Sequence, residues 1–179
     1  PSLDVQWHPG HSRGLTGVAL LPAEAGTERA ALAVTAGVDQ TLRVIDVRSG
    51  EPVRMLHNHT AAVHAVAARP GAPPSLPIVA SISDDRTVRF WQPTIGRMMR
   101  FARLESVPLC LTWSRDGRRL VTGCADGAVR VINPQTAALA HTETIDEGPL
   151  LSIAALPGSP IAIVGSHSGA LRRVTLSGE

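Results

Sequence analysis

His59, Ser81 and Asp85 are the three residue types of a hydrolytic triad, and they lie close together in the chain. Such a trio can turn the serine into a nucleophile where an oxyanion hole and a path for substrate accompany it. The surrounding pattern instead predicts that Ser81 lies in mid-strand and faces Trp91, where neither feature is available. The trio therefore does not indicate catalysis, and we expect this chain not to be an enzyme.

A second chemical hypothesis is a metal site at His57, His59 and His64, the one dense histidine group in the sequence. A metal centre needs a further ligand and converging side chains. His57 ends a predicted strand and His64 lies inside the next one, so the three rings are expected to diverge. The sequence predicts no metal site and no cofactor.

The two cysteines, Cys110 and Cys124, are predicted on adjacent strands. A hairpin centred near residue 116 places Cys110 opposite Thr122, so the two thiols are diagonal and a disulfide between them would be strained. We expect two free, buried thiols of a reducing compartment. With no export signal in the sequence, this favours a cytoplasmic protein.

These residues belong to a pattern that recurs along the chain. Anchored on Asp39, Asp85, Asp126 and Ser168, four similar segments follow one another at intervals of 46, 41 and 42 residues. Each consists of a run of small residues, a polar turn of two residues and an apolar run containing arginine, which predicts a β-hairpin. Further short strands are predicted before the hairpins (Leu15–Leu20, Val63–Ala68, Leu109–Trp113, Leu150–Ala155) and after three of them (Val53–Leu56, Met98–Leu104, Ala138–Thr142).

The repeats resemble those of the WD-repeat family. The family's pattern is Gly-His, an apolar strand, a turn aspartate and a closing Trp-Asp, and the matching residues are Gly10-His11, Asn58-His59, Asp39, Asp85, Asp126 and Phe90-Trp91-Gln92. The resemblance implies an all-β fold, a β-propeller whose blades each have four antiparallel strands.

The resemblance also implies a structural tetrad of polar residues in each blade. The second repeat has all four members, the first and third are incomplete, and the fourth has no tetrad: His59, Ser81, Asp85 and Trp91; His11, Thr35 and Asp39; Thr122 and Asp126. A hairpin centred near residue 86 would place Ser81 opposite Trp91, whose indole N–H needs an acceptor when buried. We expect these residues to hold the fold together.

The predicted strands amount to four blades in one segment, residues 1–179, with cores at about 11–56, 59–104, 107–143 and 149–176 plus 3–7. The fourth repeat lacks its outer strand, and Leu3–Trp7 is predicted to complete that last blade from the N-terminal side. Three closures remain open. The segment is part of a longer polypeptide, or two copies build an eight-bladed ring, or four blades close alone.

The resemblance implies a docking platform for proteins or peptides, so the expected function is a non-enzymatic protein-interaction scaffold. The alternative is a sensory or regulatory module of a larger multidomain signalling protein. Loops beside the tetrads supply the candidate partner-binding residues: Arg13, Thr60, Asp84, Arg86, Glu105, Ala125, Glu147 and His167.

Composition favours a packed chain with a weak overall charge. The sequence is 44% apolar and 18% charged, with a formal net charge of +2. An arginine recurs in the third strand of each repeat (Arg43, Arg89, Arg130, Arg172), with its stem expected to pack and its head to reach water. Because so small a net charge attracts phosphates weakly, we expect no nucleic acid partner. No apolar run is long enough to span a bilayer, and we expect no membrane partner.

Overall fold

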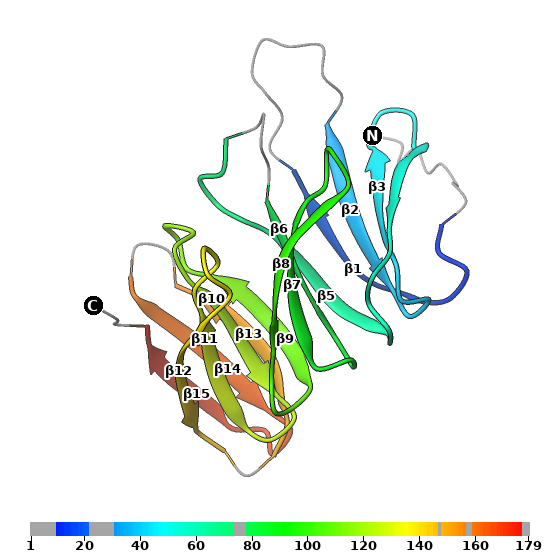
Figure 1. Ribbon diagram of the computed structural model, residues 1–179. Coiled ribbons are helices and arrows are strands. Elements are labelled where there is room, and N and C mark those ends of the chain that lie inside the picture. Colours follow the sequence, from blue (N-terminus) through cyan, green and yellow to red (C-terminus); the bar gives the residue numbers. More distant parts are fainter. Residues whose placement is uncertain (1–9, 22–30, 74–77, 147, 157–158, 177–179) are drawn as a thin grey trace, which may run out of the picture.

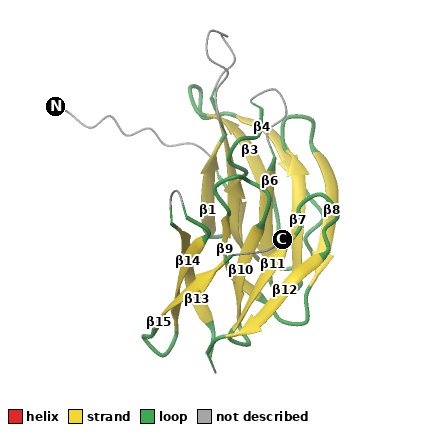
Figure 2. Cartoon of the chain, turned by 90° about the vertical axis from the view of Figure 1, so that its left-hand side faces the viewer, coloured by secondary structure: helices red, strands yellow, loops and turns green. Residues whose placement is uncertain are grey.

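The computed structural model describes residues 10–21, 31–73, 78–146, 148–156 and 159–176, and these residues form strands, turns and loops without a helix (Figure 1). They contain no helix long and apolar enough to cross a membrane. Fifteen strands make three sheets of four strands and one of three within the described ranges. In each sheet the chain runs back and forth between neighbouring antiparallel strands (Figure 2).

The sheets follow one another in chain order. The first contains β1 (Leu15–Leu20), β2 (Leu32–Gly37), β3 (Leu42–Asp46) and β4 (Pro52–Leu56). The second contains β5 (Val63–Ala68), β6 (Val79–Ser83), β7 (Thr87–Gln92) and β8 (Arg97–Arg103). The third contains β9 (Pro108–Trp113), β10 (Leu120–Cys124), β11 (Ala128–Ile132) and β12 (Leu139–Thr144). The fourth contains β13 (Leu150–Ala155), β14 (Ile161–Ser166) and β15 (Leu171–Thr175).

The core lies between the sheets, which pack face to face. Strands β6, β10 and β11 are buried at every position, because neighbouring sheets cover both of their faces. Three apolar clusters join the first sheet to the second, the second to the third and the third to the fourth. In Figure 1 the blue first sheet and the orange-red end of the chain lie at opposite ends of this row.

Equivalent turns join the second and third strands of every sheet. Gln40, Arg86, Gly127 and Gly169 all have a left-handed backbone at the same turn position. In each turn the amide of that residue donates to a carbonyl three residues earlier, for example Arg86 N–H to Ser83 O at 3.1 Å. The turn aspartates Asp39, Asp85 and Asp126 therefore occupy equivalent places, as the repeat predicted.

The hairpin register corrects one detail of the sequence analysis. Three residues, not two, separate β6 from β7, so the hairpin is centred on residue 85 and Ser81 is paired with Arg89. Trp91 pairs instead with Val79. The prediction that Ser81 lies directly opposite Trp91 is wrong, because the left-handed residue Arg86 lengthens the turn.

The all-β fold class with four-stranded antiparallel blades is confirmed, and the strands lie within about two residues of their predicted bounds. The predicted strand Leu3–Trp7 lies outside the described residues. Completion of the last blade by that strand therefore stays a prediction, as does the division of the chain into blade cores.

Candidate functional site

The complete tetrad is a hydrogen-bonded chain that crosses the second sheet. Trp91 Nε1 lies 2.9 Å from Ser81 Oγ, which lies 2.7 Å from His59 Nε2, and His59 Nδ1 lies 2.8 Å from Asp85 Oδ2. One arrangement of protons satisfies every group: the indole donates to Ser81, the hydroxyl donates to Nε2, and Nδ1–H donates to the carboxylate. His59 is therefore neutral and protonated on Nδ1 in this network.

The buried position of Ser81 argues for a structural role. The side chain is fully buried, and its hydroxyl already accepts from Trp91 and donates to His59. A nucleophile needs a path for substrate. The contacts instead fasten the loop that carries His59 to the sheet it enters.

The first sheet holds its entering loop in the same way. His11 Nδ1 lies 2.8 Å from Asp39 Oδ1, and His11 Nε2 lies 2.8 Å from Thr35 Oγ1. Asp39 Oδ2 also accepts from the backbone N–H of Ser12 at 2.9 Å. Ile45 occupies the position of the tryptophan, so this network ends at Thr35.

In the third sheet an arginine, and not a histidine, contacts the turn aspartate. Arg130 donates to both carboxylate oxygens of Asp126, at 2.9 and 2.6 Å. This contact lowers the pKa of Asp126 and raises that of Arg130. Arg130 is only 3% exposed, so the expectation that its head reaches water is wrong. The paired hydrogen bonds hold the guanidinium at the turn carboxylate, away from water.

Sequence reasoning missed the threonines that complete the carboxylate sites. Thr87 Oγ1 donates to Asp85 Oδ1 at 2.5 Å, and Thr41 Oγ1 donates to Asp39 Oδ1 at 2.8 Å. The signal was present, because a threonine follows the turn aspartate by two residues in both repeats, a spacing typical of side-chain-stabilised turns.

Burial and hydrogen bonds shift the two ionisable members of the tetrad. Burial raises the pKa of Asp85, but hydrogen bonds from Thr87 and His59 outweigh it and lower the pKa to about 2. Burial lowers the pKa of His59 below its usual value, against the opposing effect of Asp85. In both cases the unfolded chain takes up a proton at a higher pH than the folded chain.

Acidification is therefore expected to destabilise the protein in two stages. Below about pH 6.5, His59 binds a proton more readily in the unfolded chain than in the folded one. Below about pH 4, Asp85 also binds a proton more readily in the unfolded chain, and this difference continues down to its folded pKa of about 2. Urea unfolding at several pH values measures this. A His59→Gln variant should lose the first stage, whereas His57→Gln, at an exposed loop position, should keep it. Equal pH dependence in all three proteins would contradict the assignment.

The candidate partner-binding residues gather at one end of the sheets, which we call the tetrad face. Arg13 lies just before β1, and the other described members lie in loops between strands: Thr60, Asp84, Arg86, Glu105, Ala125 and His167. All are exposed except Ala125, which is half-buried. Glu147 lies outside the described residues. Asp84 has a partner that the sequence analysis missed, since His64 Nε2 lies 2.6 Å from its Oδ1.

The structure also describes the residues of the two other chemical hypotheses, a metal site and a disulfide between Cys110 and Cys124. The described residues contain no group of three or more His, Cys, Asp or Glu side chains that could hold a metal ion. Cys110 and Cys124 are free and buried, and burial raises the pKa of the Cys110 thiol to about 11. Cys110 pairs with Gly123, not with Thr122 as predicted, because the hairpin is shifted by one residue.

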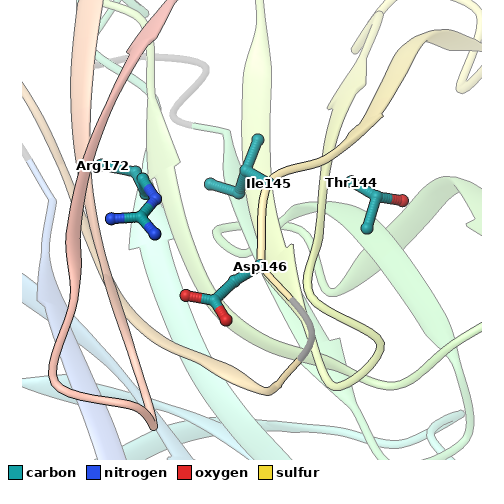
Figure 3. Close-up of a pocket in the computed structure, with 4 residues that line it drawn as sticks. All are labelled: Thr144, Ile145, Asp146 and Arg172. Carbon is teal, nitrogen blue, oxygen red and sulfur yellow. The ribbon is translucent and has the colours of Figure 1, made fainter.

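A hollow of about 480 Å³ lies between the third and fourth sheets, lined by Thr144, Ile145, Asp146 and Arg172 (Figure 3). The fourth repeat has Ser168 where the others have the turn aspartate. Figure 3 shows the carboxylate of Asp146 directed toward Arg172, and Ser168 Oγ donates to Asp146 Oδ2 at 3.2 Å. A carboxylate from the preceding loop thus replaces the missing turn aspartate.

Comparison with known proteins agrees with this geometry. The model of the WD domain, G-beta repeat, matches residues 50–92, and that of the WD40 domain of anaphase-promoting complex subunit 4 matches residues 77–164. Both matches include the second hairpin with Ser81, Asp85 and Trp91, and the match over residues 50–92 also includes His59. The chain belongs to the WD-repeat family. WD repeats generally serve as non-enzymatic platforms for protein interaction.

Several curated WD-repeat relatives match part of the chain. Coronin-7 of Rattus norvegicus is 31% identical over 122 residues, which is 64% of this chain and 12% of coronin-7. The ribosome biogenesis protein bop1-A of Xenopus laevis is 40% identical over 62 residues, covering 34% of this chain and 8% of the relative. The B-type cell cycle switch protein ccs52B of Medicago truncatula is 29% identical over 138 residues, covering 76% of this chain and 28% of the relative. The WD-repeat chain thus spans a small share of each relative.

Among solved structures, the computationally designed Ika4 protein has the same fold. The match covers 99% of this chain and 100% of that one, with a TM-score of 0.77 and 21% sequence identity. At this identity the likeness shows the fold alone. It agrees with the arrangement of WD-repeat sheets described above.

Proposed function

We propose that this WD-repeat segment is a non-enzymatic scaffold that binds a protein or peptide through the tetrad face. The observation that carries the proposal is the fastening of two loops of that face to buried sites: the networks of His11 and His59 each join an entering loop to its sheet. Arg13 and Thr60 stand exposed on these loops. A partner can therefore bind without a large cost for ordering the loops.

The tetrad face offers both signs of charge at one turn. Asp84 and Arg86 are exposed on either side of Asp85. The carboxylate of Asp84 contacts His64 on β5. Mixed charges above a rigid apolar core suit a peptide segment that carries charges of both signs. We therefore place Arg86 and Asp84 at the centre of the proposed site.

Peptides selected from a random phage-displayed library on the immobilised chain test this proposal. Isothermal titration of the selected peptides should show at least about tenfold weaker binding to Arg86→Glu and to Asp84→Arg. Arg118→Glu is the control. Arg118 is exposed on the loop between β9 and β10, which lies at the end of the third sheet opposite to the tetrad face. Unchanged affinity in both tetrad-face variants, with normal melting temperatures, would reject the site.

Two further points belong to the proposal. The length of the relatives supports the alternative in which this scaffold acts as a regulatory module of a longer signalling protein, and the same binding site would then serve that protein.

The reduced, buried state of both cysteines supports a cytoplasmic location.

A further inference from the structure

The outer edge of the second sheet carries three arginines and an exposed aromatic ring. Strand β8 is the last strand of this sheet, and no other described strand pairs with its free edge (Figure 2). Complete four-stranded sheets pack on both faces of the second sheet, so no further sheet at either end of the row would cover β8. Arg97 and Arg103 are exposed, and Phe101 is 48% exposed. A free edge of this kind can accept a further strand.

The guanidinium groups of β8 lack acidic partners. Arg97, Arg100 and Arg103 form no ion pair with the residues that the structure describes. Arg100 donates to Pro134 O at 3.3 Å, and the other two arginines are exposed to water. The strand therefore presents uncompensated positive charge to the solvent, although the formal net charge of the chain is only +2.

Protection of a sheet edge against pairing with other chains explains an occasional charge on an outer strand. It does not explain why β8 differs from the outer strands of the two neighbouring sheets. Strand β4 contains one arginine, Arg54, which donates to Thr94 O at 3.4 Å, and β12 contains no arginine. Strand β8 is also the longest described strand, with seven residues. The arginines are therefore a feature of this one edge.

Two residues of β8 direct their backbone hydrogen-bonding groups to the free edge. Leu104 N–H donates to Arg86 O at 2.8 Å, so the backbone of Leu104 is turned toward β7. In an antiparallel pair such residues alternate with residues turned the other way. The N–H and C=O groups of Arg103 and Phe101 therefore point away from β7, whereas those of Ala102 bond to it. An added strand would thus pair with the two residues that carry the exposed ring and an exposed guanidinium.

The ring of Phe101 is held in place from behind. The guanidinium carbon of Arg89 lies 5.5 Å from the centroid of this ring. Arg89 is itself fixed, because its Nε–H donates to Thr87 Oγ1 at 3.1 Å and its Nη2 lies 3.4 Å from Asp85 Oδ2. A partner therefore meets an aromatic ring that is already ordered, which lowers the cost of binding.

We propose that an extended acidic segment of a partner protein binds along β8 as a fifth strand of the second sheet. Its backbone bonds to Phe101 and Arg103, its carboxylates pair with the arginines of β8, and an apolar side chain covers the exposed ring. Single-stranded nucleic acid is the other partner that arginines and an exposed ring suit. The free edge favours the peptide, because its carbonyl oxygens accept from peptide N–H groups and repel phosphates.

Fluorescence anisotropy with a labelled peptide of repeating Glu-Glu-Val-Val sequence tests the proposal. This repeat places carboxylates and apolar side chains in alternation on each face of an extended strand. Arg97→Glu and Arg103→Glu should each weaken its binding at least about tenfold, because each turns an attraction into a repulsion. Arg118→Glu is the matched control, since Arg118 is exposed outside β8, and it should bind the peptide as the unaltered chain does. Unchanged affinity in both β8 variants, or no binding of the peptide to the unaltered chain, would overturn the proposal.

Two further measurements separate strand addition from simple attraction between charges. A peptide of the same sequence with N-methyl groups on amides of both its edges keeps its charge but loses its donors, so it should not bind. In the complex with the unmodified peptide, amide hydrogen exchange should slow at Phe101 and Arg103 and stay unchanged at Ala102, whose N–H already bonds to β7.

Three results of these measurements would contradict strand addition on β8. They are equal binding of the N-methylated peptide, unchanged exchange at both Phe101 and Arg103, and displacement of the labelled peptide by oligothymidylate at a lower concentration than by unlabelled peptide. The last result would assign the edge to nucleic acid. None of these outcomes depends on Asp84 or Arg86, so this proposal and that for the tetrad face stand or fall separately.

Discussion

Replacing Gly127 with alanine is expected to destabilise the protein by about 3 kcal/mol or more. Gly127 has a φ of 75° in the turn of the third sheet, where an L side chain is strained. A Cβ at this position would also overlap the backbone carbonyl oxygen of Asp146. Because that oxygen belongs to the main chain, the overlap can be removed only if the loop into the fourth sheet moves. That movement would disturb the hydrogen bonds from the N–H groups of Ile145 and Asp146 to Gly127 O.

Gly169 provides the matched control for this substitution. It occupies the same turn position in the fourth sheet with a φ of 83°, and a Cβ there would meet nothing within 4 Å. Gly169→Ala should therefore cost only the backbone strain, about 1 kcal/mol. Urea unfolding followed by tryptophan fluorescence measures both variants. Similar losses in the two would mean that the packing of the third turn against the Asp146 loop is wrong.

Replacing Asp85 with alanine is expected to cost about 3 to 5 kcal/mol of folding free energy. The carboxylate accepts from His59, from Thr87 Oγ1 and from the backbone N–H of Thr60 at 3.1 Å, and Arg89 lies 3.4 Å away. Its removal leaves several buried donors without an acceptor, which costs more than the net value of the bonds themselves. The loop that carries His59 should also loosen, which faster amide exchange near Thr60 would report.

The neighbouring aspartate is the natural comparison. Asp84 is exposed and its contact with His64 lies at the surface, so Asp84→Ala should cost less than about 1 kcal/mol. Thermal unfolding of the two variants side by side tests the distinction. If Asp85→Ala is as mild as Asp84→Ala, the tetrad does not hold the second sheet.

The pairing of strands in two hairpins differs from the sequence prediction. Periodicity and turn residues identified every described strand, yet Ser81 pairs with Arg89, and Cys110 with Gly123. The length of the turn between β6 and β7 depends on the left-handed backbone of Arg86, and for a residue other than glycine the sequence gives little warning of this. The hydrogen bond from Trp91 to Ser81 forms nevertheless, because a long indole side chain reaches its diagonal neighbour.

Local chemistry in the chain was sufficient for the repeat, the hairpins, the turn aspartates and the tetrad of the second sheet. These features depend on the alternation of side chains along a strand and on a few turn residues, which neighbouring positions specify. The bond between Arg130 and Asp126, the surface pair of His64 with Asp84 and the free edge of β8 became visible only in three dimensions. Each depends on how a side chain or a strand meets groups from another strand or another repeat, and a single repeat does not contain that information.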